Sequence, residues 1–149
     1  MCLMLYIATE DDVPLRRSAE LSVEAVEPSC EAVRQWFSLP VVRFIAVPTS
    51  CSCGFPHVLA EEPLEYYDGM FDGDDRESVL KSVDALLALV REHVTATAHV
   101  ELYPIWSGGE GERPKGRIDL RVAALDRDRF FVIEQFLYRV TPGFQIEAS

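Results

Sequence analysis

The chain has 149 residues, 48% of them hydrophobic and 26% charged, and its 14 Lys and Arg against 25 Asp and Glu give a formal net charge of -11. This balance is typical of a folded globular protein, and the length suits a single domain over residues 1–149. An acidic chain lacks the clustered cations that bind a phosphate backbone or an anionic bilayer, so the charge argues against nucleic acid and membrane partners.

The N-terminal segment predicts a buried strand. Residues 3–8 are apolar almost without interruption, which is typical of a strand covered on both faces, and an acidic cluster from Glu10 closes the run. No basic residue precedes this run, which is shorter than the core of a signal peptide, and no apolar run approaches the roughly 18 residues of a membrane-spanning helix. We therefore expect a cytoplasmic protein with reduced cysteines.

A second strand, a short helix and a third strand are predicted before residue 48. Residues 19–26 alternate between apolar and polar side chains, which favours a half-exposed strand at a sheet edge that could pair with a second copy in a homodimer. Ser29 is placed to open a short helix, and Pro40 to end it. Residues 41–47 are rich in β-branched and aromatic side chains, which indicates an inner strand.

The loop predicted after this strand contains the best candidate for a metal site. Cys51 and Cys53 stand one residue apart and His57 follows four residues later, so two thiolates and an imidazole could converge on zinc. The usual zinc spacing places two to four residues between paired cysteines, and this pair has one. A redox pair, a strained disulfide, or small side chains packed in a tight turn therefore stay open as alternatives.

The segment 61–75 mixes acidic and aromatic side chains. Such a segment could dock on a basic partner or bind a hard cation, although it departs from the calcium-loop pattern. A surface connection with a few aromatic anchors is the alternative interpretation.

The second half of the chain predicts a long helix followed by three strands. Apolar residues recur at steps of three and four over residues 75–94, which indicates an amphipathic helix. Strands are predicted over 99–106, 117–125 and 130–140, and their short connections favour antiparallel neighbours in a meander. The fold class is thus α+β, a mixed, mostly antiparallel sheet of about five to six strands packed against one long and one short helix.

The connection between the first two of these strands is unusual in composition. Residues 107–112 are rich in glycine and acidic side chains, which predicts a mobile loop that repels phosphate. The nearest approach to a basic cluster, Arg113, Lys115 and Arg117, follows directly and adjoins Glu110 and Glu112.

Glu101 and Glu134 are the candidate catalytic residues. On strict alternation Glu134 would share an apolar face with Phe136 and Tyr138, where a carboxylate has the raised pKa of a general acid. If the two glutamates lay across adjacent strands, they would form a paired-carboxylate site. An ion pair with Arg121 or Arg139, or exposure at an edge, is the alternative for Glu134.

These observations leave two classes of function. The absence of a complete catalytic set and the acidic aromatic segment favour a non-catalytic binding or protein-interaction domain. The alternative is a thiol- or zinc-dependent protein with its site at the Cys51-Ser52-Cys53 loop. Whether the protein is an enzyme stays open.

Overall fold

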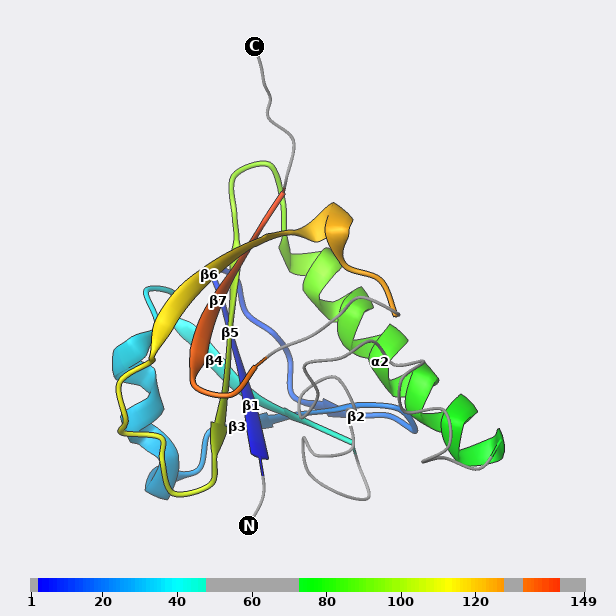
Figure 1. The fold of residues 1–149 in the computed structure, drawn as a ribbon, viewed down its shortest axis with the longest axis horizontal. Coiled ribbons are helices and arrows are strands. Elements are labelled where there is room, and N and C mark those ends of the chain that lie inside the picture. The colour runs from blue at the N-terminus through cyan, green and yellow to red at the C-terminus, as the bar shows by residue number, and fades with distance from the viewer. Residues whose placement is uncertain (1–2, 48–72, 128–132, 143–149) are drawn as a thin grey trace.

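One mixed sheet organises the protein, whose computed structural model describes residues 3–47, 73–127 and 133–142. Within these residues seven strands run in the order β2-β3-β4-β1-β5-β7-β6. The strands are β1 (Leu3–Thr9), β2 (Arg16–Arg17), β3 (Ser22–Ala25), β4 (Val41–Ala46), β5 (Val100–Trp106), β6 (Gly116–Arg121) and β7 (Phe136–Thr141). Helix α2 (Gly73–His93) covers one face and the 3₁₀ helix η1 (Pro28–Trp36) the other, so the structure has three layers (Figure 1). The predicted α+β class is confirmed.

Strand β1 lies at the centre of the sheet. It pairs antiparallel with β4 and with β5, and Leu5 stands opposite Ile45 on one side and Pro104 on the other. Both of its faces are covered, since Leu5 and Ile7 point toward α2 while Tyr6 and Ala8 point toward η1. This double burial explains why the segment is apolar at nearly every position.

Helix α2 forms the larger core with one face of the sheet, which we call the α2 face. Val83, Leu86 and Val90 are fully buried on one side of the helix and pack in one cluster with Leu5 and Leu102. Each such side chain stabilises the fold by about 1.5–3 kcal/mol through removal of its apolar surface from water. The predicted amphipathic helix is confirmed.

Helix η1 covers the opposite face, the η1 face. Glu27 is its N-cap and Pro28 occupies the first position, where a missing N–H costs nothing, so the start lies before the predicted cap at Ser29. Val33 is its one fully buried residue, while Trp36 and Phe37 pack at its end. The short helix thus stays on the sheet through Val33 and the aromatic side chains at its end.

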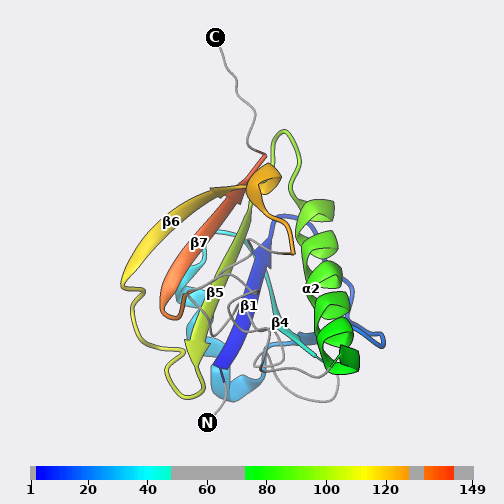
Figure 2. The same cartoon turned by 45° about the vertical axis from the view of Figure 1, so that its right-hand side comes forward.

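The predicted meander is wrong in strand order. Strand β7 lies between β5 and β6, antiparallel to β5 and parallel to β6 (Figure 2). Strand β6 ends at Arg121, a 3₁₀ turn η4 (Val122–Ala124) follows, and β7 begins only at Phe136. The connection is therefore long enough to carry the chain back to the start of a parallel neighbour, which a hairpin turn cannot do.

The expected edge strand is not quite at the edge. Strand β3 pairs with β4 on one side, while Arg16 and Arg17 of β2 cover Val23 and Ser22 on its other side. Since β2 has two residues, the last two residues of β3 have no strand partner on this side within the described part of the chain.

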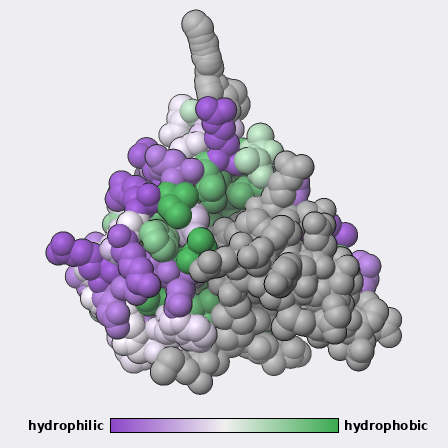
Figure 3. Space-filling model, in the orientation of Figure 1, coloured by the Kyte–Doolittle hydropathy of each residue, from purple (hydrophilic) through white to green (hydrophobic). Residues whose placement is uncertain are grey.

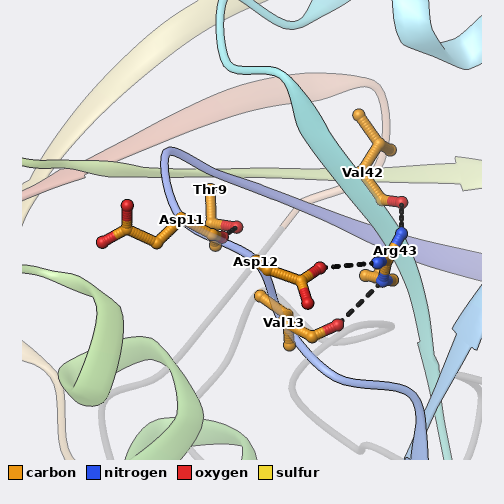
Figure 4. Close-up of polar contacts among 6 residues, drawn as sticks. All are labelled: Thr9, Asp11, Asp12, Val13, Val42 and Arg43. Carbon is orange, nitrogen blue, oxygen red and sulfur yellow. Dashed lines mark hydrogen bonds and ion pairs between the residues drawn. The ribbon is translucent and has the colours of Figure 1, made fainter.

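The turn after β1 is fixed by Arg43 on β4 (Figure 4). Its Nε donates to the Val13 carbonyl at 2.9 Å, Nη1 to the Val42 carbonyl at 3.3 Å, and Nη2 to the Asp12 carboxylate at 3.0 Å. Thr9 Oγ1 donates to the Asp11 carbonyl at 2.7 Å in the same turn. One guanidinium fork thus satisfies three acceptors, which a lysine cannot do.

The surface over β6 and β7 shows hydrophobic side chains within a hydrophilic surround (Figure 3). From the same two strands, Ile118, Leu120 and Phe136 are partly buried and pack against the α2-face core. No helix among the described residues is both long and apolar enough to cross a membrane.

Candidate binding site

A row of four side chains crosses the η1 face. Glu24 on β3 stands opposite Phe44 on β4, Phe44 opposite Tyr6 on β1, and Tyr6 opposite Tyr103 on β5. Because facing residues of paired strands point to the same side of a sheet, the four lie side by side on one surface. The rings of Tyr6 and Phe44 are 5.7 Å apart and tilted by 51°.

A pocket of about 150 Å³ opens where this row meets the start of η1, and we call it the Tyr6 pocket. Its lining consists of Met4, Tyr6, Glu24, Ala25, Glu27, Cys30 and Phe44. Tyr6 is 1% exposed and forms the inner part, whereas Glu24 and Glu27 are exposed at the rim. A space of this size takes one group about as large as a benzene ring.

The hydroxyl of Tyr6 is held from behind by a buried carboxylate. Tyr6 Oη donates to Glu110 Oε2 at 3.0 Å, and the other oxygen of Glu110 accepts the Gly108 N–H at 3.0 Å. Burial raises the pKa of Tyr6 above its ordinary value, and the hydrogen bond with Cys30 and the charge of Glu110 add to the rise. Tyr6 is therefore a neutral hydroxyl with a fixed position.

Three aromatic residues fix the loop at residues 107–115 to the η1 face. Besides the Tyr6 contact, Trp36 Nε1 donates to the Glu110 carbonyl at 2.9 Å and Tyr103 Oη to the Glu112 carbonyl at 2.9 Å. Burial, and then the charge of Glu112, raise the pKa of Tyr103 to about 12. The loop that composition predicts to be mobile is thus hydrogen-bonded to the fold at three points.

The electrostatics of the Tyr6 pocket favour a cation. Glu24 and Glu27 bring two carboxylates to the rim, and Ser22 Oγ donates to Glu24 Oε2 at 2.8 Å and so orients the first of them. The rings of Tyr6 and Phe44 line the pocket, and the face of an aromatic ring attracts positive charge. An anion would meet repulsion from both glutamates.

Glu101 is buried on the same η1 face, in β5. It is 1% exposed, and its two oxygens accept the Ser38 N–H at 2.9 Å and the Ser38 hydroxyl at 3.0 Å. The Nε2 atom of His99 lies 4.0 Å from Glu101 Oε2, is buried, and has no hydrogen-bond partner among the described residues. Burial, and then the charge of Arg139, lower the pKa of His99.

The structure does not bring Glu101 and Glu134 together. Glu134 lies in the turn before β7, and not on a strand face, because β7 begins at Phe136. The next residue, Gln135, donates its N–H to the Pro104 carbonyl, toward the opposite end of β5 from Glu101. The expected paired-carboxylate site is therefore not formed by these two residues.

The candidate metal ligands Cys51, Cys53 and His57 lie outside the described residues, as does nearly all of the acidic aromatic segment. The zinc and thiol hypotheses for that loop thus stay predictions. Among the residues that the structure does describe, no group of three or more His, Cys, Asp or Glu side chains is placed to hold a metal ion.

The Tyr6 pocket was missed by pattern reasoning. Tyr6 itself carries a usable signal, because a tyrosine inside a fully buried strand must find a partner for its hydroxyl. That partner, Glu110, is 104 residues away in the chain, and no local periodicity connects the two. Glu24 and Cys30 look like ordinary surface positions until the sheet register places Glu24, and the packing of η1 on the sheet places Cys30, beside Tyr6.

Comparison with known proteins adds no family to this picture. No family model matches the chain, and neither any curated protein nor any solved structure does.

Proposed function

We propose that this protein is a non-catalytic binding domain, which takes a cationic side chain of a basic protein partner, Lys or Arg, into the Tyr6 pocket. The observation that carries the proposal is the combination of two aromatic rings with two rim carboxylates around one space of about 150 Å³. This is the chemistry with which proteins recognise ammonium and guanidinium groups.

The energetics fit a side chain better than a free ion. Contact of a cation with aromatic faces contributes about 0.5–2 kcal/mol, depending on how far the site is desolvated. Burial of the aliphatic stem against Met4 and Phe44 adds roughly 0.8 kcal/mol for each methylene. A strongly hydrated metal ion would gain neither contribution.

A binding role is also supported by how the buried carboxylates are used. Glu110 accepts hydrogen bonds from Tyr6 and from the Gly108 backbone, and Glu101 accepts two from Ser38. Both therefore hold segments of the fold together, and burial and the charge of Glu110 raise the pKa of Tyr6, which favours its neutral hydroxyl over a nucleophilic phenolate. The net charge of -11 supports a basic partner further, because it speeds the encounter with positively charged proteins.

The test uses a matched pair of small probes. We expect Nα-acetyl-lysine methylamide to shift the NMR signals of Cys30 and Phe44 saturably, whereas the norleucine analogue, which has the same stem without the charge, does not. A single side chain of this size should bind with a dissociation constant of the order of millimolar.

Two variants locate the site. Glu24→Gln and Glu27→Gln should each weaken binding of the lysine probe about three- to fivefold, as expected for partly exposed ion pairs. Glu20→Gln removes the same charge outside the pocket and should leave binding unchanged. Equal binding of the two probes, or equal effects of all three variants, would refute the proposal, since it would leave only a general attraction to an acidic surface.

A further inference from the structure

A second groove lies at the other end of η1, beside the edge strand β6, and we call it the Trp36 groove. It has a volume of about 320 Å³ and is wide open to solvent. Its lining consists of Trp36, Arg113, Pro114, Gly116, Arg117 and Leu137. None of these residues lines the Tyr6 pocket, so the groove is a separate feature.

The charge of this groove is opposite to that of the protein as a whole. Arg113 and Arg117 contribute two guanidinium groups, in a chain with 14 basic against 25 acidic residues. In the described part of the chain, no carboxylate lies within ion-pair distance of either group. Two guanidinium groups that line one groove, and have no carboxylate partner among the described residues, are suited to bind an anion.

Gln135 holds the groove in shape. It has a φ of 66°, in the left-handed region that is unfavourable for a residue other than glycine. Its N–H donates to the Pro104 carbonyl, its carbonyl accepts the Lys115 N–H, and its side chain donates to the Arg113 carbonyl at 3.0 Å. These bonds fix the backbone from Arg113 to Lys115 against β5, so the point from which the Arg113 side chain extends is set before a ligand arrives.

The other side chains that line the groove are apolar, and they indicate what kind of group the rest of a ligand should have. The indole N–H of Trp36 is already donated to the Glu110 carbonyl, so the ring has carbon surface to offer. Pro114 and Leu137 add further apolar contact. A ligand that suits the groove has one anionic group for the arginines and a flat apolar body for Trp36.

We propose that the Trp36 groove binds a planar organic carboxylate, which is a flat ring that carries a single negative charge. A carboxylate fits the guanidinium fork through two parallel hydrogen bonds. The net charge of -11 penalises every further negative charge on the ligand, and this favours a monovalent carboxylate over a divalent phosphate. The inference does not depend on the function proposed for the Tyr6 pocket.

The experiment is an NMR titration of the protein with benzoate, followed at the indole N–H of Trp36. We expect a saturable shift with a dissociation constant of about 1–10 mM, the range for a probe of nine heavy atoms. Cyclohexanecarboxylate, phenylphosphate and inorganic phosphate serve as comparison probes at the same ionic strength. Each should bind at least threefold more weakly than benzoate.

Variants on the same edge provide the control. Arg113→Gln and Arg117→Gln should each weaken benzoate binding about three- to tenfold. Arg121→Gln removes an equal charge from the end of the same strand, outside the groove, and should change binding by less than twofold. The proposal is overturned if benzoate does not saturate, if phenylphosphate or inorganic phosphate binds more tightly, or if Arg121→Gln weakens binding as much as the groove variants do.

Discussion

Two buried glutamates join parts of the η1 face that are far apart in the chain. Glu101 of β5 receives both hydrogen bonds of Ser38, just after η1, and Glu110 receives the hydroxyl of Tyr6 from β1. A buried carboxylate is unfavourable unless such partners satisfy it, so each of these positions is sensitive to loss of a partner.

The pair Tyr6 and Glu110 gives the first prediction. Glu110→Ala leaves the Tyr6 hydroxyl and the Gly108 N–H without their acceptor and should lower the free energy of unfolding by about 2–3 kcal/mol. The double variant with Tyr6→Phe should be less destabilised than the sum of the single variants, because no orphaned hydroxyl remains. Urea denaturation measures all three, and strict additivity would show that the hydrogen bond has no energetic weight.

His99 gives the second prediction, which concerns acid stability. Its pKa is lowered in the folded state by burial and by Arg139, more than Glu101 and Glu10 raise it. The unfolded chain therefore binds the proton first, so the stability from this site is complete above the ordinary pKa of about 6.5 and is lost as the pH falls toward the folded value.

The variant His99→Gln tests this assignment. It should flatten the slope of unfolding free energy against pH just below about 6.5, where the ordinary histidine titrates. The exposed neighbour Thr97→Ala serves as the control and should keep the slope. An unchanged slope in His99→Gln would assign the pH dependence to other groups.

At the scale of elements, the parts of the fold that local pattern dictates were predictable. Apolar residues recur at helical spacing in α2 because one side of the helix is buried, and β1 is apolar at nearly every position because both of its faces are buried. Both patterns can be recognised in consecutive residues. The place of β7 between β5 and β6 depends on pairing between distant segments, for which no short-range signal exists. The expected strand at 130–140 also missed the left-handed Gln135, which ends regular alternation before Phe136.

For the site too, local sequence patterns predict single residues, whereas contacts between distant segments could not be predicted. Glu101 was a predicted candidate and is buried with partners, yet its role as a link to Ser38 required knowledge of where η1 ends. The row from Glu24 to Tyr103 is a product of strand register alone, which a one-residue slip would abolish. Sequence could therefore identify strands but not the neighbours that make a pocket.

Helix α2 gives the third prediction. Leu86 is fully buried between the helix and the sheet, so Leu86→Ala should lower the free energy of unfolding by about 2–5 kcal/mol through lost burial and the cavity left behind. Lys81→Ala, on the exposed side of the same helix, should change it by less than about 0.5 kcal/mol. Thermal and urea unfolding of the two variants provide the comparison, and similar losses would contradict the assigned orientation of the helix.

At the scale of the whole molecule, charge is distributed unevenly over the η1 face. The carboxylates Glu24 and Glu27 lie near one end of η1, and the guanidinium groups of Arg113 and Arg117 lie near the other. The two ends therefore attract groups of opposite sign, although the molecule as a whole carries a charge of -11.

This net charge gives the fourth prediction. Self-repulsion among the excess carboxylates destabilises the compact state, and salt screens it, since the Debye length falls from about 30 Å at 0.01 M to about 8 Å at 0.15 M. The melting temperature should rise by roughly 2–4 °C over this range, equivalent to about 1 kcal/mol. Calorimetry at constant pH measures it. A falling melting temperature would mean that attractive pairs, such as Arg43 with Asp12, outweigh the repulsion.

The insertion of β7 between β5 and β6 has a consequence for how the chain is made. During synthesis β6 leaves the ribosome before β7, but its only strand partner in the described sheet is β7. Strands β1, β4 and β5 can pair as soon as they emerge. Strand β6 stays unpaired until β7 has emerged and has inserted between β5 and β6. A nascent chain stalled after β6 should therefore remain open to proteases from β6 onward, and the last strand to appear is the one that closes the sheet.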